Sequence, residues 1–470
     1  MTNKTRKVAV TVSALGTLWA ANPGLAQESE TIRELKSQVQ ELDQKLRIVE
    51  RRLELEREAA TEKSKSATSI SAGAGGFGLR SADTNFVLKL RGYVQADSRW
   101  FLNDKIDAND TFLLRRVRPI FEGTVFDKYD FRVMLEFGSG ASSSAANNGF
   151  VQDAYLNARF LPEFQVQFGK FKEPVGLERL QSGANLLFLE RAYPTQLVPN
   201  RDVGVQLQGE LFRGTLNYAV GIFNGVADGG SGDFETADDE KDGAARLFAQ
   251  PFRNTSIDAL KGLGIGLAGT LGNQEGPLRS FVSPGQQRIF AYRTSTSTNA
   301  PNVEADGDHW RLVPQGYYYW GPFGLFGEYA VSGQDVRQVS GGAGAGATAE
   351  LRHTAWQVAA SYVLTGEENS WRGITPTRPF NLSSGGWGAW EIAARYSELD
   401  LDDDTFPIFS NPNTSVTGAK SWAIGVNWHL NRNVKFNLNY EETDFEGGIQ
   451  NPVAAQGKEQ AILTRAQVSF

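Results

Sequence analysis

The sequence predicts an all-β protein: a sixteen-stranded antiparallel transmembrane β-barrel with an N-terminal periplasmic coiled-coil helix. From residue 85 to the end of the chain, hydrophobic residues alternate with polar ones, which is the period of half-buried strands. About sixteen such strands can be counted, and bacterial barrels have an even number. The connections alternate between short and long, as in barrels with short periplasmic turns and long outer loops.

Residues 1–26 have the features of a secretory signal peptide. Lys4, Arg6 and Lys7 give a positively charged start, and the apolar stretch 8–21 is too short to span a bilayer. Small residues at 24–26 suit cleavage, so we expect an exported mature chain. The chain has no cysteine, which excludes a disulfide framework and a thiolate metal site. No later apolar run is long enough to predict a transmembrane helix.

Residues 27–63 are predicted to form a coiled-coil helix. Apolar residues recur at alternating steps of three and four, and charged residues flank them. The seam consists of Ile32, Leu35, Val39, Leu42, Leu46, Val49 and Leu53. The pattern suggests association without fixing the number of helices, and the alternative is a single amphipathic helix that lies on a surface. A stretch rich in Ser, Thr and Gly follows, and we expect residues 64–84 to be a flexible linker.

Residues 85–470 form the predicted barrel domain. Its strands are expected to start near residues 85, 111, 130, 149, 164, 202, 214, 243, 260, 308, 324, 351, 386, 419, 433 and 458. A soluble β-sandwich would also alternate, but aromatic residues near the strand ends favour a membrane barrel. The chain ends in Phe470, and a final strand with a terminal Phe resembles those of bacterial outer-membrane barrels. The apolar run 288–292 is assigned to a loop, and segment 365–385 is longer than the alternation of connections allows.

A long connection follows the predicted strand at residues 164–168. It lacks the period of two, and it carries the candidate pore cations Lys172, Arg179, Arg191 and Arg201. A sixteen-stranded barrel encloses a wide channel, so a segment folded inward is needed to set its width. The apolar run 186–189 would be solvated in an exposed loop. We therefore expect this connection to pack against the inner wall, and a solvated surface loop is the alternative.

The alternation also places basic residues on the wall of the lumen. The residues predicted to face it are Lys89, Arg91, Arg116, Arg118, Arg132, Arg159 and Arg395. Arg115 has the opposite parity, so it needs a bulge or an interface position to take part. Arginine suits phosphate because its planar fork makes paired, charge-assisted hydrogen bonds. The acids Asp97, Glu122, Glu136 and Asp153 could neutralise some of these cations.

Several long stretches resemble the family of phosphate-selective porins O and P. They include "FKEPVGLERL", "NRDVGVQLQGELFRGTLNYAVGIFNG", "VNWHLNRNVKFNLNY" and the closing "TRAQVSF", and the resemblance spans residues 85–470. It implies a trimeric sixteen-stranded porin of the bacterial outer membrane, with a channel for phosphate or polyphosphate lined by arginine and lysine. The stretch "LLRRVRP" is similar to the family's basic strand at the constriction, where Arg115, Arg116 and Arg118 match.

Together these observations lead us to expect a passive, anion-preferring outer-membrane porin that passes phosphate or polyphosphate. The expected partners are membrane lipid, lipopolysaccharide, small anions and two further copies of the chain, with possible cell-wall contact through the coiled coil. No cofactor, nucleic acid or enzymatic activity is expected, since the three histidines are widely scattered. A porin with other or no selectivity, or a structural tether to the cell wall, is the alternative. Acidic stretches at 233–242 and 398–404 would repel anions within a Debye length, roughly 8 Å.

Overall fold

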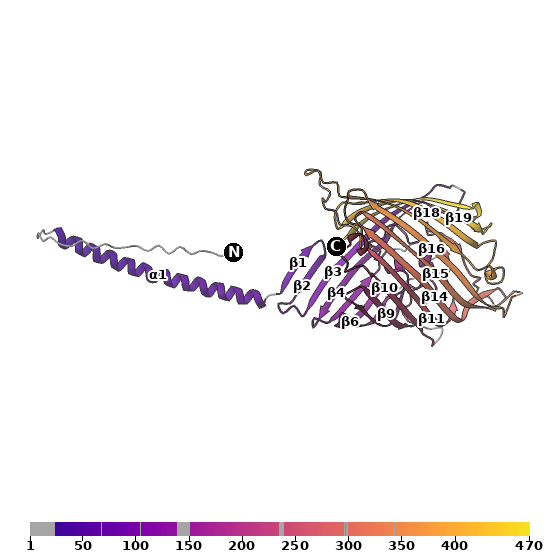
Figure 1. Cartoon of the computed structure of the whole chain (residues 1–470), viewed down its shortest axis with the longest axis horizontal. Helices are drawn as coiled ribbons and strands as arrows, with labels where there is room; N and C mark the ends of the chain where they lie inside the picture. Colours follow the sequence, from indigo (N-terminus) through magenta and orange to yellow (C-terminus); the bar gives the residue numbers. More distant parts are fainter. Residues whose placement is uncertain are drawn as a thin grey trace. The chain divides into compact units, whose positions relative to one another are not determined.

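The computed structural model describes residues 24–66, 68–103, 105–138, 151–234, 239–295, 297, 299–342 and 344–470. The chain divides into two compact units, Met1–Ala67 and Thr68–Phe470. In the first unit a single helix, α1 (Gly24–Ser66), contains the predicted helical residues 27–63 (Figure 1). Its apolar seam is exposed along the single chain, and its association with other helices stays a prediction. Most of the predicted signal peptide lies outside the described residues.

The second unit is a closed antiparallel barrel of sixteen strands, because the last strand pairs with the first barrel strand. The barrel strands are β3 (Val87–Phe101), β4 (Thr111–Val125), β5 (Tyr129–Leu135), β6 (Val151–Leu161), β7 (Phe164–Lys172), β8 (Arg201–Leu211), β9 (Leu216–Phe223), β10 (Asp242–Ala249), β11 (Leu263–Pro277), β14 (Asn302–Trp320), β15 (Phe323–Ser340), β16 (Thr348–Val363), β17 (Ala389–Asp400), β18 (Val416–His429), β19 (Val434–Gly447) and β20 (Lys458–Ser469). This confirms the predicted fold of the barrel. Among the described residues, no helix is both long enough and apolar enough to cross a membrane.

The predicted strand starts agree with the observed ones to within three residues, with one exception. The strand expected near residue 308 begins at Asn302. The pairing of β14 with β15 is irregular between Ala305 and His309, and Gly307 has a positive φ of 140°. A β-bulge of this kind interrupts the alternation of faces, so the regular pattern becomes visible only after it.

The barrel strands are polar inside and apolar outside. On β19, Phe436 and Leu438 are 43% and 50% exposed, whereas Asn437 and Asn439 between them are buried. The same inversion recurs around the wall, with exposed Leu, Ile, Val, Phe and Trp on the outer surface. A soluble protein buries its apolar residues, so this surface is suited to lipid.

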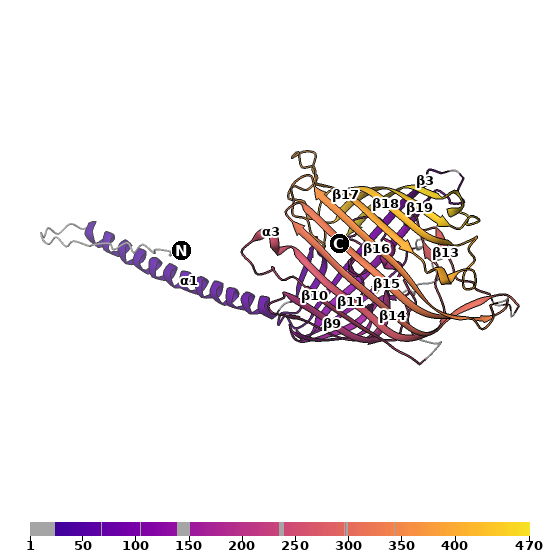
Figure 2. The same ribbon diagram turned by 45° about the vertical axis from the view of Figure 1, so that its right-hand side comes forward.

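The wall of the barrel is not of equal height around its circumference (Figures 1 and 2). In what we call the low wall, β5 to β10, four of the six strands have only 7 to 9 residues. In the tall wall, β14 to β19, the three longest strands have 19, 18 and 16 residues. At about 3.3 Å per residue, the longest and shortest strands differ by roughly 40 Å in length.

The prediction that residues 64–84 form a flexible linker is wrong for most of this segment. Residues 64–66 belong to α1, and β1 (Ser69–Gly73) and β2 (Gly76–Arg80) form a hairpin. Strand β2 pairs with the first residues of β3, on the edge that β20 occupies further along. The many Ser and Gly residues suggested flexibility, but Ile70, Phe77 and Leu79 alternate with them, and this alternation is a strand signal.

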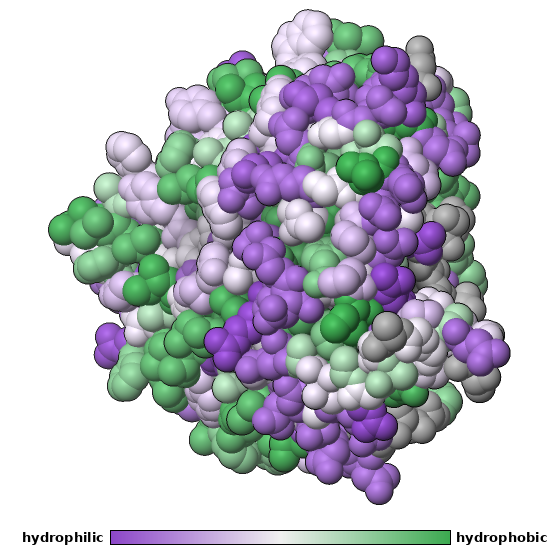
Figure 3. All heavy atoms as spheres, turned by 90° about the vertical axis from the view of Figure 1, so that its right-hand side faces the viewer, coloured by the Kyte–Doolittle hydropathy of each residue, from purple (hydrophilic) through white to green (hydrophobic). Residues whose placement is uncertain are grey.

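The connections are mostly short at one end of the barrel, the turn end, and long at the other, the loop end. Figure 3 looks onto the side on which the long loops lie, where hydrophilic residues run across the middle of the face. The loops carry small elements: α2 (Leu177–Leu180), η1 (Tyr193–Gln196), β12 (Phe281–Val282), β13 (Arg288–Phe290), η2 (Asp403–Thr405) and η3 (Ala454–Gln456), while α3 (Asp258–Lys261) lies at the turn end. The apolar run 288–292 therefore does lie in a loop, as expected, and among the described strands β12 and β13 pair only with each other.

Segment 364–388 joins β16 to β17 and is long although it lies at the turn end. Its length has a structural reason, because it reaches the loop between β7 and β8. The side-chain amide of Gln181 in that loop donates a hydrogen bond of 2.7 Å to the carbonyl oxygen of Trp371. The connection that is too long for a turn thus contacts the loop between β7 and β8 from the turn end.

Candidate functional site

The connection between β7 and β8, residues 173–200, is hereafter the inward loop. All of its residues except Ser182 are buried or half-buried. Its apolar run packs as expected, with Leu186, Phe188 and Leu189 at most 2% exposed. Phe188 belongs to a cluster with residues of β10, β15, β16, β17 and β18, and the Arg395 guanidinium lies 4.4 Å from its ring centre. The loop therefore folds into the barrel.

One carboxylate of the inward loop, that of Glu190, ties the loop to the surrounding wall. Glu190 accepts hydrogen bonds of 2.6 and 3.0 Å from Arg115 and lies 3.7 Å from Arg116. Arg99 and Arg465 approach the same carboxylate to 3.5 and 3.6 Å. Burial alone would raise the pKa of Glu190, but Arg115 and Arg116 lower it below its ordinary value. Glu190 is therefore the centre of a buried ionic cluster.

The position of Arg115 in this cluster depends on a β-bulge. Gln95 pairs with Arg116 while the next residue, Ala96, pairs with Leu114, so Arg115 is the extra residue of β4. The bulge allows two consecutive arginines to reach Glu190, as the parity of the sequence required. Arg116 is only 3% exposed and also donates a 2.7 Å hydrogen bond to Gln95. Both side chains thus hold the loop and are not free to meet a solute.

A hollow of about 560 Å³ lies between the inward loop and the low wall. Glutamines 165, 167, 206 and 208 line part of it. Its charged lining residues are Arg118, Arg132, Lys172, Arg201, Arg246, Asp153 and Glu210. Within the described residues the lining therefore has five cations and two carboxylates, which is the composition expected of a passage for anions.

Three of these cations have carboxylate partners. Asp153 lies 2.7 Å from Arg201 and 3.2 Å from Arg132. Arg132 also approaches Glu122 at 3.3 Å. Arg118 pairs with Glu136 at 2.5 Å and donates a 2.8 Å hydrogen bond to the hydroxyl of Tyr93. The positive charge of these arginines is thus partly neutralised.

The other two cations have no carboxylate within ion-pair distance in the described part of the chain. Lys172 donates hydrogen bonds to the carbonyl oxygens of Leu180 and Gln181, at 3.4 and 2.9 Å. Arg246 lies 4.5 Å from the ring centre of Phe248 and donates a 3.4 Å hydrogen bond to Gln315. Their partners are neutral groups, so no described carboxylate offsets the charge of either side chain. Arg246 was missed from the sequence, although it shares a strand face with Ala244 and Phe248.

The remaining sequence-predicted residues lie at other places. Arg179 donates to the carbonyl oxygen of Thr195, and Arg191 donates to those of Glu178 and Gln181. These two residues therefore help to fold the inward loop on itself. Arg91 and Arg159 are about half exposed near the turn end and pair with Glu122 and Asp130, and Lys89 is exposed beside them. None of these five lines the hollow against the low wall.

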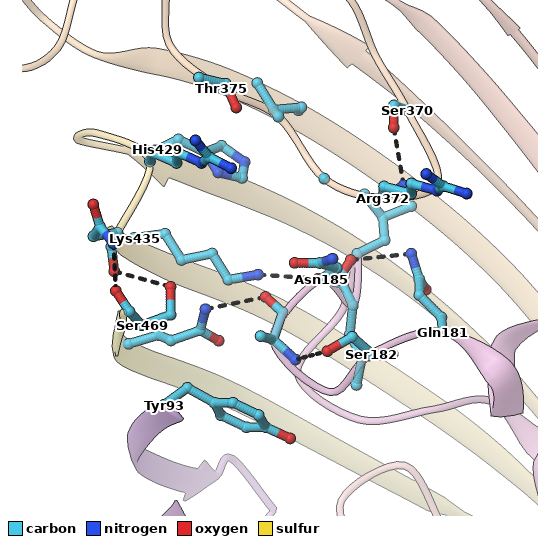
Figure 4. Close-up of a pocket in the computed structure, with 18 of the residues that line it drawn as sticks. Tyr93, Gln181, Ser182, Asn185, Ser370, Arg372, Thr375, His429, Lys435 and Ser469 are labelled. Carbon is cyan, nitrogen blue, oxygen red and sulfur yellow. Dashed lines mark hydrogen bonds between the residues drawn. The ribbon is translucent and has the colours of Figure 1, made fainter. Parts of the chain in front are cut away.

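A second hollow, of about 420 Å³, lies on the turn side of the inward loop (Figure 4). Its charged lining residues are Arg91, Arg132, Arg372, Arg432, Lys435 and Glu391. Figure 4 shows Lys435 extending towards the inward loop, where its ammonium donates a 3.3 Å hydrogen bond to the carbonyl oxygen of Leu186. Tyr93, Arg132 and Ser182 line both hollows, so the two basic spaces adjoin.

A closed barrel with an apolar outer surface, a polar interior and an inward loop defines the protein as a porin-type channel of the outer membrane, a channel rather than an enzyme. The chain belongs to the family of phosphate-selective porins O and P, whose sequence profile matches residues 88–470. This confirms the resemblance seen in the sequence and the expected location in the bacterial outer membrane.

Individual proteins are also similar to this chain. Porin O of Pseudomonas aeruginosa is 23% identical over 426 residues, which are 84% of this chain and 91% of that protein. An uncharacterized protein of Caulobacter vibrioides is 34% identical over 91 residues, 18% of this chain and 16% of that protein. The outer membrane channel DcaP of Acinetobacter baumannii superposes with a TM-score of 0.51 at 12% identity, covering 84% of this chain and 100% of that chain. The last likeness concerns the fold alone.

Proposed function

We propose that the protein is a passive, anion-preferring channel and that phosphate or polyphosphate is the preferred solute. The observation that carries the proposal is the surplus of cations over carboxylates around the hollow at the low wall, with Lys172 and Arg246 unneutralised by any described carboxylate. The description of the family as phosphate-selective porins supports this choice of solute.

The proposed path follows the low wall. An anion leaves the water at the loop end, passes the arginines and Lys172, and reaches the second basic hollow beyond the inward loop. Arginine can offer two parallel donors to a phosphate, which lysine cannot. In a narrow space the attraction is stronger than in bulk water, where two unit charges at 4 Å gain only about 1 kcal/mol. Partial neutralisation by Asp153 and Glu136 keeps binding weak enough for release.

Single-channel recording of the purified protein in planar bilayers tests this proposal. We expect a chloride-to-potassium permeability ratio above one from the reversal potential in a salt gradient, and a block of chloride current that increases with added phosphate. A ratio below one contradicts the anion proposal and leaves a general porin of the same fold. A ratio above one without phosphate block leaves an anion channel of another preference.

We also propose that the protein is a homotrimer and that α1 of the three copies forms a periplasmic coiled coil. The exposed seam of α1 supports this, since its apolar residues are 48% to 64% exposed in the single chain. Deleting residues 27–66 should leave trimeric, conducting barrels, because barrel closure satisfies the backbone without the helix. Monomers in detergent would instead make the helix the main source of assembly. We further propose that α1 contacts the cell wall and that the barrel contacts lipopolysaccharide. Co-sedimentation with peptidoglycan, compared between the full-length protein and the protein that lacks residues 27–66, tests the contact of α1.

A further inference from the structure

The hairpin β1–β2 is an addition to the barrel that the sixteen-stranded wall does not require. It lies at the turn end beside β3 (Figure 1), where β2 pairs with Val87–Leu90. The aromatic rings of Phe77 and Phe470 are 6.3 Å apart, and Asn433 donates a 2.9 Å hydrogen bond to the carbonyl oxygen of Ala74 in the hairpin turn. The hairpin therefore continues the wall beyond the point at which β20 ends.

The two faces of the hairpin differ in polarity. Residues directly opposite each other in antiparallel strands share a face. Ile70 is opposite Leu79, and Leu79 is opposite Leu88 of β3. The next row on this face lies further from the turn end, and its residues are Ala72, Phe77, Leu90 and Phe121. The other face carries Ser69, Ser71, Gly78, Arg80 and Lys89.

The apolar face is exposed and continuous with the outer surface of the barrel. Ile70, Phe77 and Leu79 are 81%, 54% and 45% exposed. Leu88 and Phe121, in the same two rows, are 40% and 41% exposed and lie on the outer side of the barrel wall. The surface that meets lipid around the barrel therefore extends without interruption onto the hairpin.

We propose that the apolar face of the β1–β2 hairpin lies in the periplasmic leaflet of the outer membrane, against phospholipid acyl chains. A second copy of the chain is a poorer occupant, because three large apolar side chains are far fewer than the roughly 20 residues per side of a stable interface. Lipid needs no such minimum area, since every exposed apolar group contributes separately.

The free edge of β1 fixes the depth of the hairpin. Among the described strands, β1 pairs only with β2, so the backbone groups of its outer edge have no sheet partner. Backbone groups without a hydrogen-bond partner are strongly disfavoured in hydrocarbon, which places β1 at the level of the headgroups. Because Leu90 is further along β3 from the turn end than Leu88, Phe77 lies deeper in the leaflet than Leu79.

Site-directed spin labelling of the full chain in phospholipid vesicles tests this inference. The chain has no cysteine, so Phe77→Cys, Leu79→Cys and Ile70→Cys each give a single labelling site, and Ser71→Cys is the matched control on the opposite face. We expect the ratio of oxygen to water-soluble nickel-complex accessibility to be several-fold higher at Phe77 than at Ser71, with Leu79 and Ile70 in descending order between them. Unchanged conductance and heat-modifiable gel migration confirm that each variant has folded.

Two results would overturn the inference. Nickel accessibility at Phe77 as high as at Ser71 would place the apolar face in water. An immobilised spectrum with spin–spin broadening at Phe77 would place this face against a neighbouring subunit. The same labels in detergent micelles serve as a reference, because the depth gradient depends on a bilayer.

Discussion

The low wall and the tall wall use similar side chains for different purposes. On the low wall, Arg132, Lys172, Arg201 and Arg246 line an open hollow. On the tall wall, Arg395 donates a 2.8 Å hydrogen bond to the carbonyl oxygen of Glu190 and pairs with Glu441 at 3.2 Å, so it is occupied by the inward loop and by its neighbour.

The carboxylates show the same division. Glu328 of the tall wall accepts hydrogen bonds from the backbone N–H groups of Leu177 and Glu178, at 2.5 and 3.2 Å. Asp153 of the low wall instead pairs with two arginines of the passage. What separates the basic residues of this lumen is therefore whether they line the hollow at the low wall or are covered by the inward loop. The position of each residue around the barrel, and not the number of cations in the sequence, decides its role.

The largest expected effect comes from detaching the loop from its ionic cluster. Glu190→Gln leaves Arg99, Arg115 and Arg116 buried near a neutral group, and breaking a buried pair typically costs about 3 to 5 kcal/mol. We expect unfolding at lower urea concentration, measured by gel migration, and noisier single-channel current. The matched control is Glu446→Gln, which removes an exposed pair with Lys420 and should cost about 1 kcal/mol or less. Equal losses in the two variants would show that the loop is held in another way.

The second expected effect separates the walls by function. Arg246→Gln should lower the chloride-to-potassium permeability ratio and weaken phosphate block several-fold, with little change in unfolding, because it removes a charge that lines the hollow and has no described carboxylate partner. Arg395→Gln should instead lower the stability to unfolding and leave the permeability ratio nearly unchanged, since it removes the arginine that pairs with Glu441. Lys420→Gln, which changes the same charge on the outer rim, controls for the overall charge. A fall in selectivity for Arg395→Gln alone would invert the assignment of the walls.

A smaller effect is expected on stability when an acidic residue is placed on the lipid-facing side of the barrel and not on the lumen side. Phe436→Asp places an acid on the outer side of the tall wall and should cost about 2 kcal/mol or less, depending on depth. Gln208→Glu adds the same charge on the lumen side of the low wall, beside the cations, and should leave stability nearly unchanged. Unfolding in lipid vesicles measures both. Similar costs at the two positions would contradict the assigned faces of the strands.

The smallest effect is expected at the outer loops. Asp239 is exposed at the loop end, and Asp239→Asn should change only the salt dependence of anion conductance, because exposed charges act within about one Debye length. Conductance at low and high potassium chloride concentration measures this. A change in the permeability ratio at high salt would mean that Asp239 reaches the passage.

The barrel could be predicted from the sequence because its determinants are local. Alternation along each strand identifies the strand and its faces, as Phe436 and Asn437 illustrate, and it is interrupted at bulges such as those at Arg115 and near Gly307. The inward loop was also predictable, since the apolar run 186–189 has no place in a solvated loop. The hairpin β1–β2 was missed because composition was given more weight than the alternation of Ile70, Phe77 and Leu79.

The roles of the individual cations could not be predicted, because their partners are distant in the chain. Arg115 and Arg116 look like free lining residues until Glu190, about 75 positions away, is placed between them. Arg179 and Arg191 similarly turn out to bind carbonyl oxygens of their own loop. Lys172 also donates to carbonyl oxygens of that loop, but it and Arg246 line the hollow at the low wall, and Arg179 and Arg191 do not.

The shared edge of β3 has a consequence for the order of assembly. The closing pair joins the first and last strands of the barrel domain, and Gly92 and Phe470 exchange two backbone hydrogen bonds of 2.9 Å at its end. Such a contact is as non-local as the chain permits, so it is a slow, late step of folding. Strand β2 covers the start of the same edge of β3 that β20 completes. The hairpin, whose own strands are neighbours in sequence, thus occupies the part of β3 at which the pairing with the final strand ends.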